Sequence, residues 1–275
     1  MSLEPSTPDS PSVTPVLLKE MKRRGEKIAV LTAYDYPTAR LLDESGIEML
    51  LVGDSVGMVV LGYPDTTHVT IEEMVHHTRA ASRGAKRALV VADLPFGTYT
   101  MPKQAVVNAR RLMEAGAHAV KLEGGREQSE QIEAIVGEGI PVMAHLGMLP
   151  QSVKIEGGYK IKGKTPVEAE KLLDDAKAIQ QAGAFAVVLE LVKADVAAQI
   201  TTMLAIPTIG IGSGPDCDGQ VLVSHDLIGL FPWFTPKFVK PHGHVAEQIR
   251  ASACAFIADT KRPGQPEVAR SSSFD

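Results

Sequence analysis

The sequence predicts an α/β fold in which eight parallel strands and their connecting helices close into a single-domain (β/α)8 TIM barrel. Three observations support this fold class. The chain has 275 residues, and such barrels typically need about 250. Short apolar runs alternate with amphipathic helical patterns along most of the chain. No G-x-G-x-x-G motif follows the first apolar run, which argues against the competing open, doubly wound sheet.

The composition excludes several classes of protein. Hydrophobic residues make up 44% and charged residues 22%, as in ordinary soluble globular proteins. A net charge of −5 with 5% aromatic residues argues against nucleic-acid binding, which needs a basic surface. Two cysteines are too few for a disulfide framework or a Cys-rich zinc site. With no membrane-length apolar run and no secretory signal, we expect a cytoplasmic protein that contacts neither membrane nor nucleic acid.

Both ends of the chain lack hydrophobic periodicity. Residues 1–14 are rich in Ser, Pro and Thr, and residues 261–275 have a similar character. Such segments bury too little apolar surface to fold, so we expect two short flexible tails. The catalytic barrel domain is therefore expected over residues 15–260.

The predicted strands are short apolar runs that end at Gly, Pro or a polar residue. Continuous apolar runs of this length are typical of parallel strands buried on both faces. Seven runs are clear and an eighth is shorter, at 28–35, 49–54, 88–95, 119–124, 141–147, 186–191, 207–214 and 236–240.

The predicted helices lie between these runs. Thr70 with Glu73 three residues on forms a capping-box pattern. Thr165-Pro166 begins another helix that stops before Gly183, as Pro-first and Gly-last preferences predict. The expected helices are 71–82, 103–115, 165–182, 193–204 and 244–259.

Acidic residues gather at the carboxyl ends of the predicted strands. In a barrel these ends meet at one mouth, where active sites lie. Acids placed there repel one another unless a cation binds or some become protonated. The five acids are Asp35, Asp54, Asp93, Glu123 and Glu190.

Three of these acids suggest a metal site. Asp54, Asp93 and Glu123 end the second, third and fourth runs, so they would be neighbours on the rim. Oxygen ligands with room for water and substrate suit Mg²⁺. The alternative is that each acid caps the helix that follows it.

Three further polar residues have both structural and functional interpretations. Lys121 lies two residues before Glu123, so both face the barrel interior; it either pairs with a carboxylate or meets an anionic substrate. Glu190 ends the sixth run, away from the three acids, where it is either a general base or a cap. His145 is either a polar contact of the site or a satisfied core histidine.

Several motifs resemble the ketopantoate hydroxymethyltransferase family. They occur in the family's order over roughly residues 15–260, too many to match by chance. The motifs are TAYDYPTA (32–39), LLVGDSVGMVVLGYPDTTHVTIEEMVHHTRA (50–80), VVADLPFGTY (90–99), VKLEGG (120–125), PVMAHLGMLPQSV (141–153), GGYKIKGK (157–164), VVLELV (187–192) and IPTIGIGSGPDCDGQVLVSHDLIG (206–229).

The resemblance implies a Mg²⁺-bound barrel, related to the phosphoenolpyruvate mutase and isocitrate lyase enzymes. It implies transfer of a one-carbon unit from 5,10-methylenetetrahydrofolate to 3-methyl-2-oxobutanoate, giving 2-dehydropantoate for pantothenate and coenzyme A biosynthesis. Family members are typically cytoplasmic homodecamers.

The resemblance also assigns roles to residues, by motif. Metal ligands are Asp54, Asp93 and Glu123; substrate contacts are Asp54, Ser55, Asp93, Lys121 and His145; the catalytic base is Glu190. The lysine-containing loop 151–165 is expected to cover the site or to contact the polyanionic folate tail.

The chain departs from the family pattern only in loops. Lys154 stands where the pattern has Asn, Ser213 stands where Ala is commoner, and residues 215–217 are atypical. An alternative function is that of a related Mg²⁺-dependent 2-oxo acid lyase or mutase. Such a relative needs a Cys in the loop after the third strand, and residues 96–104 contain none. A non-catalytic barrel would be favoured by loss of a strand-end acid, and none is missing.

Overall fold

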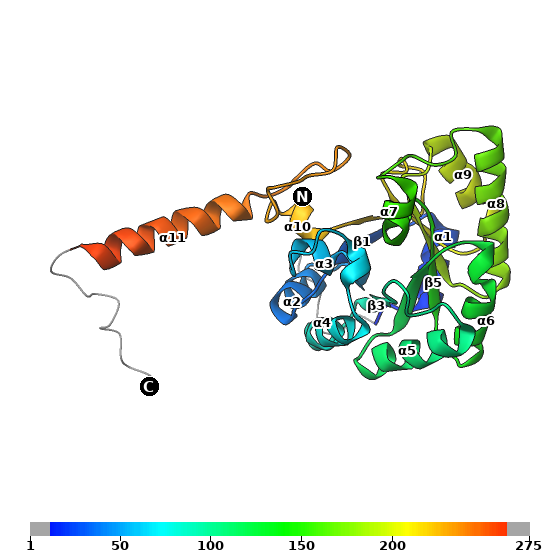
Figure 1. The fold of residues 1–275 in the computed structure, drawn as a ribbon, viewed down its shortest axis with the longest axis horizontal. Helices are drawn as coiled ribbons and strands as arrows, with labels where there is room; N and C mark the ends of the chain where they lie inside the picture. Colours follow the sequence, from blue (N-terminus) through cyan, green and yellow to red (C-terminus); the bar gives the residue numbers. More distant parts are fainter. Residues whose placement is uncertain (1–11, 263–275) are drawn as a thin grey trace. The chain divides into compact units, whose positions relative to one another are not determined.

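Eight parallel strands form a closed barrel in sequence order, which confirms the predicted fold class (Figure 1). The computed structural model describes residues 12–262. Strand β8 pairs with β1 and so closes the ring, with Ile28 opposite Gly219. The strands are β1 (Ile28–Thr32), β2 (Met49–Val52), β3 (Leu89–Asp93), β4 (Ala119–Glu123), β5 (Val142–Gly147), β6 (Ala186–Glu190), β7 (Thr208–Ile211) and β8 (Gly219–Leu222).

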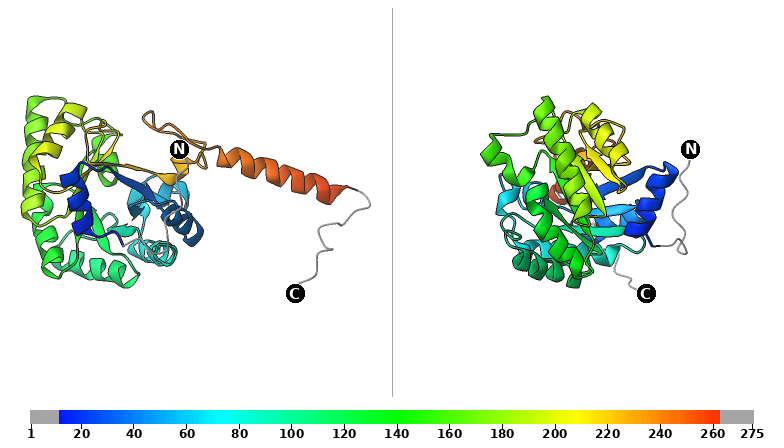
Figure 2. Two further views of the ribbon diagram at one scale, coloured as in Figure 1. Left: turned by 180° about the vertical axis from the view of Figure 1, so that it is seen from behind. Right: turned by 90° about the vertical axis from the view of Figure 1, so that its right-hand side faces the viewer.

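Within the part of the chain up to Val223, helices lie around the strands in both views of Figure 2. Short 3-10 turns, η1 (Thr66–His68), η2 (Arg126–Gln128) and η3 (Pro150–Ser152), lie in the connections. The α-helices are α1 (Pro15–Arg24), α2 (Tyr36–Glu44), α3 (Val56–Val59), α4 (Ile71–Gly84), α5 (Pro102–Glu114), α6 (Ser129–Gly137), α7 (Val153–Glu156), α8 (Pro166–Gln181), α9 (Ala194–Met203), α10 (Ser224–Leu227) and α11 (Val245–Lys261).

The predicted helix signals work as expected. Thr70 and Glu73 form both hydrogen bonds of the capping box at the start of α4. Thr165 caps α8 by accepting a hydrogen bond from the backbone N–H of Glu168.

Side-chain alternation along the strands creates two apolar layers. Every second residue points into the barrel, where the side chains fill the interior as is usual for this fold. The intervening residues pack against the surrounding helices. The interior layer comprises Ile28, Val30, Met49, Leu51, Leu89, Val91, Ala119, Met143, Ala186, Val188, Ile209 and Val221.

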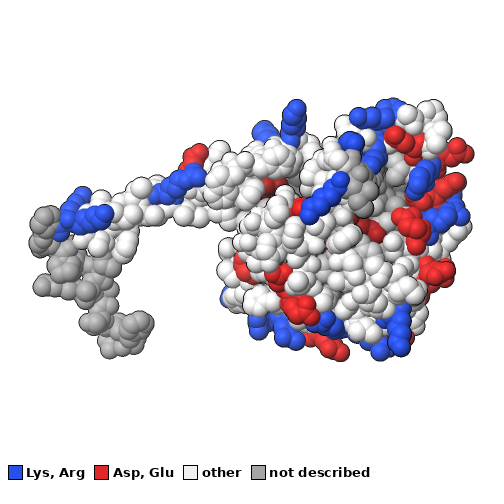
Figure 3. All heavy atoms as spheres, viewed as in Figure 1, with Lys and Arg blue, Asp and Glu red and all other residues white. Residues whose placement is uncertain are grey.

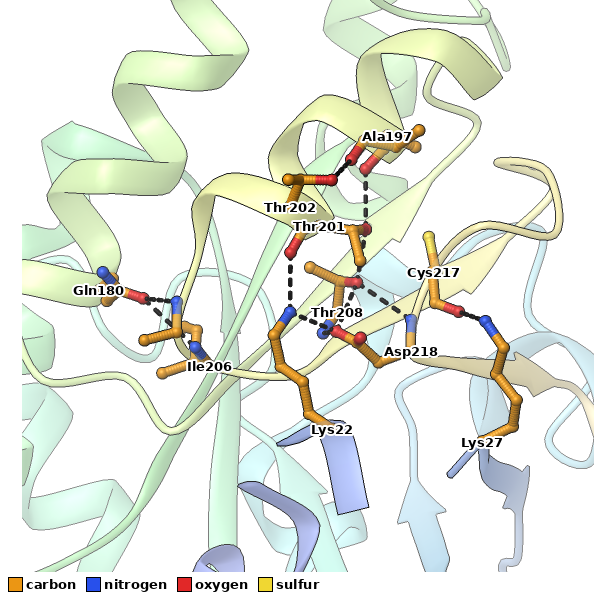
Figure 4. A network of polar contacts seen from close by, with 12 residues as sticks. Lys22, Lys27, Gln180, Ala197, Thr201, Thr202, Ile206, Thr208, Cys217 and Asp218 are labelled. Atoms are coloured by element: carbon orange, nitrogen blue, oxygen red, sulfur yellow. Dashed lines mark hydrogen bonds and ion pairs between the residues drawn. The ribbon is translucent and has the colours of Figure 1, made fainter. Parts of the chain in front are cut away.

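Helix α1 packs against the amino-terminal ends of the strands. Its Leu18 and Met21 join the interior layer. Lys22 donates to the Asp218 carboxylate, 2.7 Å away, and to the carbonyl of Thr201 at 2.8 Å (Figure 4). Asp218 also accepts from the backbone N–H of Thr208 at 2.8 Å. This network ties α1 to β7 and β8 at the end of the barrel opposite the predicted active-site mouth.

The prediction of the eighth strand at 236–240 was wrong. The strand is β8, formed by Gly219–Leu222, and residues 236–240 are irregular. Only residues 212–218 separate β7 from β8, so no helix intervenes. Because Gly219 and Gln220 open β8, it has no continuous apolar run of the kind that marks the other strands.

The described chain comprises two compact units. The barrel lies within residues up to Val223, and a second unit, with α10 and α11, begins at Ser224. We predicted one barrel domain over residues 15–260. Whether residues after Val223 belong to that domain stays a prediction. The expected tails lie largely outside the described residues, although α11 extends to Lys261.

The surface of the barrel is mixed in charge. On its visible face, Lys and Arg side chains are interspersed with Asp and Glu (Figure 3). Among residues 12–262, no helix has the length and apolar character needed to cross a membrane.

Candidate active site at the barrel mouth

The inward-facing pattern of the strands carries polar residues into the mouth. Above the apolar interior layer, Asp93 lies two residues beyond Val91 and Glu190 two beyond Val188. The strand register then sets Asp93 beside Lys121 and Glu123 beside His145. Side chains far apart in sequence are thereby brought together by strand pairing alone.

Asp54, Asp93 and Lys121 form one side of the site. The Lys121 ammonium lies 2.9 Å from Asp93 Oδ2, and the same oxygen accepts from the backbone N–H of Asp54 at 3.1 Å. Asp93 Oδ1 is buried and has no hydrogen-bond partner among the described residues. All three side chains are at most 4% exposed. A buried carboxylate oxygen without a donor is costly unless a ligand engages it.

Burial and charge shift two pKa values here in the same direction. Burial raises the pKa of Asp54 well above its usual range, and the nearby Asp93 and Glu123 raise it further. Burial works to lower the pKa of Lys121, but the carboxylates of Asp93, Glu123 and Asp54 outweigh it and the net shift is upward. Lys121 therefore stays charged. The raised pKa of Asp54 shows that the positive charge of Lys121 does not balance the negative charge of the three acids.

His145 lies between two carboxylates on the other side of the site. Its Nδ1 is 3.5 Å from Glu123 Oε1 and its Nε2 is 3.3 Å from Glu190 Oε2. These are ion-pair distances without hydrogen-bond geometry. Burial acts to lower the pKa of His145, but the two carboxylates raise it to about 9. His145 is therefore a buried, charged contact between Glu123 and Glu190, and its contact with a substrate stays a prediction.

Two residues of the site were missed by sequence reasoning. Gln151 follows β5 and hydrogen-bonds to both Asp54 and Glu123. Tyr99 donates to Gln151 Oε1 at 2.5 Å. Burial is the main cause of the raised pKa of Tyr99, so its hydroxyl stays protonated as a donor. Neutral side chains carry no charge-repulsion signal, and only their position after a strand could have suggested them.

Ser55 and Asp35 have different places in the structure. Ser55 precedes α3, and its hydroxyl lies 2.8 Å from that of the buried Tyr34. Asp35 is the N-cap of α2 and accepts from the backbone N–H of Thr38 at 2.8 Å. Of the five strand-end acids, Asp35 thus has the structural role of a cap.

The backbone around Glu190 is held firmly. Leu191 has φ of 48°, a left-handed conformation that is rare for leucine. The Glu190 carbonyl accepts from the backbone N–H of Met148 at 2.8 Å. The neighbouring Gly147 has φ of 97° and leaves no room for a Cβ against that carbonyl. The Ser213 hydroxyl donates to the carbonyl of Leu189 and accepts from the N–H of Val192.

The charge balance of the mouth suits a divalent cation. Four carboxylates face two cationic side chains, Lys121 and His145. Within residues 12–262, no three His, Cys, Asp or Glu side chains are spaced as a complete metal-ligand set. Magnesium keeps several water ligands and also binds substrate oxygens, so the protein need not supply a complete ligand set. The unpartnered Asp93 oxygen and the uncompensated negative charge fit such a site.

Known proteins match the chain closely. The sequence profile described as ketopantoate hydroxymethyltransferase matches residues 12–267. The 3-methyl-2-oxobutanoate hydroxymethyltransferase of Moorella thermoacetica is 57% identical over 257 residues, covering 93% of this chain and 96% of the relative. The enzyme of the same name from Syntrophus aciditrophicus is 55% identical over 257 residues, covering 93% of this chain and 94% of the relative.

Solved structures share the fold at low identity. A phosphonopyruvate hydrolase crystallised with oxalate and Mg²⁺ matches with a TM-score of 0.60 and 12% identity, covering 95% of this chain and 91% of that one. A 2,3-dimethylmalate lyase matches with a TM-score of 0.58 and 18% identity, covering 94% and 91%. Because the profile and the close relatives agree over nearly the whole chain, the chain belongs to the ketopantoate hydroxymethyltransferase family.

Proposed function

We propose that this enzyme transfers a one-carbon unit from 5,10-methylenetetrahydrofolate to 3-methyl-2-oxobutanoate, giving 2-dehydropantoate for pantothenate and coenzyme A biosynthesis. The observation that carries the proposal is the set of inward-facing strand ends, which brings Asp93, Lys121, Glu123 and Glu190 to one mouth. The set contains carboxylates that can bind a cation, a lysine that can bind an anion and a glutamate that can accept a proton.

Asp54, Asp93 and Glu123 are the residues proposed to hold Mg²⁺. Their support is the oxygen chemistry, the buried unpartnered Asp93 Oδ1 and the excess negative charge. When bound, the ion supplies Lewis-acid polarisation of the substrate's keto group.

Lys121, Ser55 and His145 are proposed to contact the 2-oxo acid, together with Asp54 and Asp93. Lys121 is charged and buried, so it offsets the negative charge of the substrate carboxylate. The Ser55 hydroxyl is oriented by Tyr34 and can donate to the same group. His145 supplies a second positive charge between Glu123 and Glu190.

Glu190 is proposed as the general base. Its carboxylate takes the proton from C3 of the substrate, and the electron pair of that C–H bond forms the enolate. The C3 carbon then attacks the methylene group carried by the folate. This attack breaks one of the two C–N bonds that hold the methylene group, and water then displaces the other, so that the water oxygen becomes the hydroxyl. The two folate nitrogens take up the proton from Glu190 and one proton from water. The bracing of the Glu190 backbone on both sides keeps this base in place during the exchange of protons.

The loop 151–165 and the assembly complete the proposal. Lys160, Lys162 and Lys164 lie on this loop, where they suit the polyanionic folate tail. Neutralising all three should raise the folate KM, and an unchanged KM would contradict this contact. The resemblance further implies a cytoplasmic homodecamer.

Proton exchange tests the reaction without the folate. In D₂O with Mg²⁺, the protein should exchange the C3 proton of 3-methyl-2-oxobutanoate, followed by NMR. Glu190→Gln removes the base and should slow exchange by roughly 10²–10⁴-fold, the usual contribution of general-base catalysis. The exposed Glu133 of α6 provides a matched control, because Glu133→Gln leaves the mouth untouched.

Product formation separates this function from that of a related 2-oxo acid enzyme. Purified protein with the folate donor and Mg²⁺ should form 2-dehydropantoate. Exchange without any folate-dependent product would support the lyase or mutase alternative. Exchange at the wild-type rate in Glu190→Gln would remove Glu190 from the mechanism.

A further inference from the structure

Gln151 is a buried neutral residue among the acids of the mouth. It lies in η3, four residues beyond the end of β5, and is only 4% exposed. The chemistry proposed above gives it no part. Its position nevertheless puts it in contact with two of the three carboxylates proposed to hold the cation.

Every hydrogen-bonding group of the Gln151 side chain is engaged. The amide Nε2 donates to Asp54 Oδ2 at 2.8 Å and to the carbonyl of Leu94 at 3.1 Å. The amide Oε1 accepts from the Tyr99 hydroxyl at 2.5 Å. Because the Leu94 carbonyl can only accept, the –NH₂ group must face it, and the orientation of the amide is fixed.

The Gln151 backbone makes the second connection. Its N–H donates to Glu123 Oε2 at 3.0 Å. One residue therefore binds one oxygen of Asp54, after β2, and one oxygen of Glu123, at the end of β4. Neutral donors stabilise the ionised carboxylates without cancelling their charge. The negative charge of the pair is thus still available to a cation.

We propose that Gln151 is a positioning residue, which holds Asp54 and Glu123 at a fixed separation for a divalent cation while Tyr99 orients its amide. This inference deepens the proposed function and rests on it for the role of the cation. It also links the loop that follows β5 to the metal-binding carboxylates through the first turn of that loop. Residues that orient metal ligands in this way typically contribute 10–100-fold to metal affinity.

The test measures metal binding directly. Mn²⁺ alone is titrated into the full-length protein, and free Mn²⁺ is followed by its EPR signal. Gln151→Met keeps the size of the side chain but removes its donors, and it should weaken Mn²⁺ binding by roughly 10–100-fold. Tyr99→Phe should weaken binding less and in the same direction. The double variant should be no weaker than Gln151→Met, because the short hydrogen bond of the Tyr99 hydroxyl goes to Gln151, and its contacts with the backbone N–H and carbonyl of Glu123 are long, at 3.4 Å.

Gln131 supplies the matched control. It is another buried glutamine, in α6, and its amide contacts only the Thr100 carbonyl among the described hydrogen bonds, at 3.4 Å. Gln131→Met should change thermal stability but leave Mn²⁺ affinity unchanged. A general loosening of the fold would affect the two methionine variants alike.

Each outcome decides the inference. Mn²⁺ affinity within twofold of wild type in both Gln151→Met and Tyr99→Phe would overturn it, as would equal losses in Gln131→Met. If Gln151→Met fails to fold, weakened binding in Tyr99→Phe still supports it. Wild-type protein that binds Mn²⁺ but forms no 2-dehydropantoate would refute the proposed function alone. Wild-type protein that binds no Mn²⁺ would overturn the positioning role.

Discussion

The Ser213 hydroxyl joins two backbone positions on either side of Glu190. It donates to the Leu189 carbonyl at 2.7 Å and accepts from the Val192 N–H at 2.9 Å. The side chain is 1% exposed, so water does not readily replace these bonds. The two hydrogen bonds thereby fix the turn after β6.

Ser213→Ala should lower both stability and base-dependent exchange. It leaves the buried Val192 N–H without its acceptor, which costs about 1–3 kcal/mol in the free energy of unfolding. Exchange at C3 should slow several-fold while Mn²⁺ affinity is unchanged, because the metal side is untouched. Urea unfolding and the NMR exchange assay measure the two effects. Ser45→Ala, at an exposed helix end, should stay within about 0.5 kcal/mol of wild type. Wild-type stability of Ser213→Ala would contradict this role.

The charged residues of the site could be predicted from the sequence, but the neutral residues that hold them in place could not. The acids and Lys121 could be predicted because strand ends converge and buried charges need partners. Gln151, Tyr99 and Ser213 are neutral, and their roles depend on which loops meet over the mouth. No local pattern encodes those meetings. Asp35 is the converse case, since an N-cap and a site acid look alike in sequence.

Among the elements, the loops after β2 and β5 are joined across the mouth. Lys154 in α7 contacts Asp65 Oδ2 at 2.9 Å, and Asp65 caps η1 by accepting from the Thr67 N–H. Hydrogen bonds from Thr67 and Lys154 hold the pKa of Asp65 well below its usual range.

The Asp65 link should make stability depend on pH. A folded-state pKa below the unfolded value of about 3.9 means that the stabilisation is full above that pH and is lost as the pH falls. Asp65→Asn should therefore be less stable than wild type at pH 7, with a gap that narrows below about pH 4. Urea unfolding at several pH values measures the gap. The exposed Asp174 serves as control, since Asp174→Asn should show a small gap at every pH. A pH-independent gap for Asp65→Asn would refute the link.

Element prediction succeeded where periodicity was strong. The seven longer runs are strands, and the Thr70 capping box begins α4. The eighth strand was missed because β8 begins with Gly219 and Gln220 and so has no continuous apolar run, and its place is decided by pairing with β1. Such pairing is a property of the closed ring and not of the segment.

At the scale of the whole molecule, we expect one end of the barrel to carry the catalytic residues and the other to contribute stability. Chemistry is proposed at the carboxyl ends of the strands, and the network of Lys22, Asp218 and Thr208 lies at the amino ends (Figure 4). Barrels of this class usually separate catalysis from stability in the same way.

Lys22→Met should therefore reduce stability and spare activity. The ion pair with Asp218 is 14% exposed on both sides, and losing a hydrogen bond to a charged group there costs about 1–3 kcal/mol. Thermal unfolding should show a lower Tm, while C3 exchange below that temperature is unchanged. Arg24→Met, at a half-exposed pair on the same helix, should have little effect on Tm. Loss of exchange without loss of Tm would show that the two ends are coupled.

The backbone conformation of Leu191 lowers stability but restricts the chain next to Glu190. A leucine in the left-handed region costs of order 1–3 kcal/mol, which glycine would largely avoid. Glycine would also give the chain after Glu190 conformations that leucine forbids. Relieving this unfavourable torsion to gain heat resistance would therefore loosen the chain directly after the proposed base, Glu190.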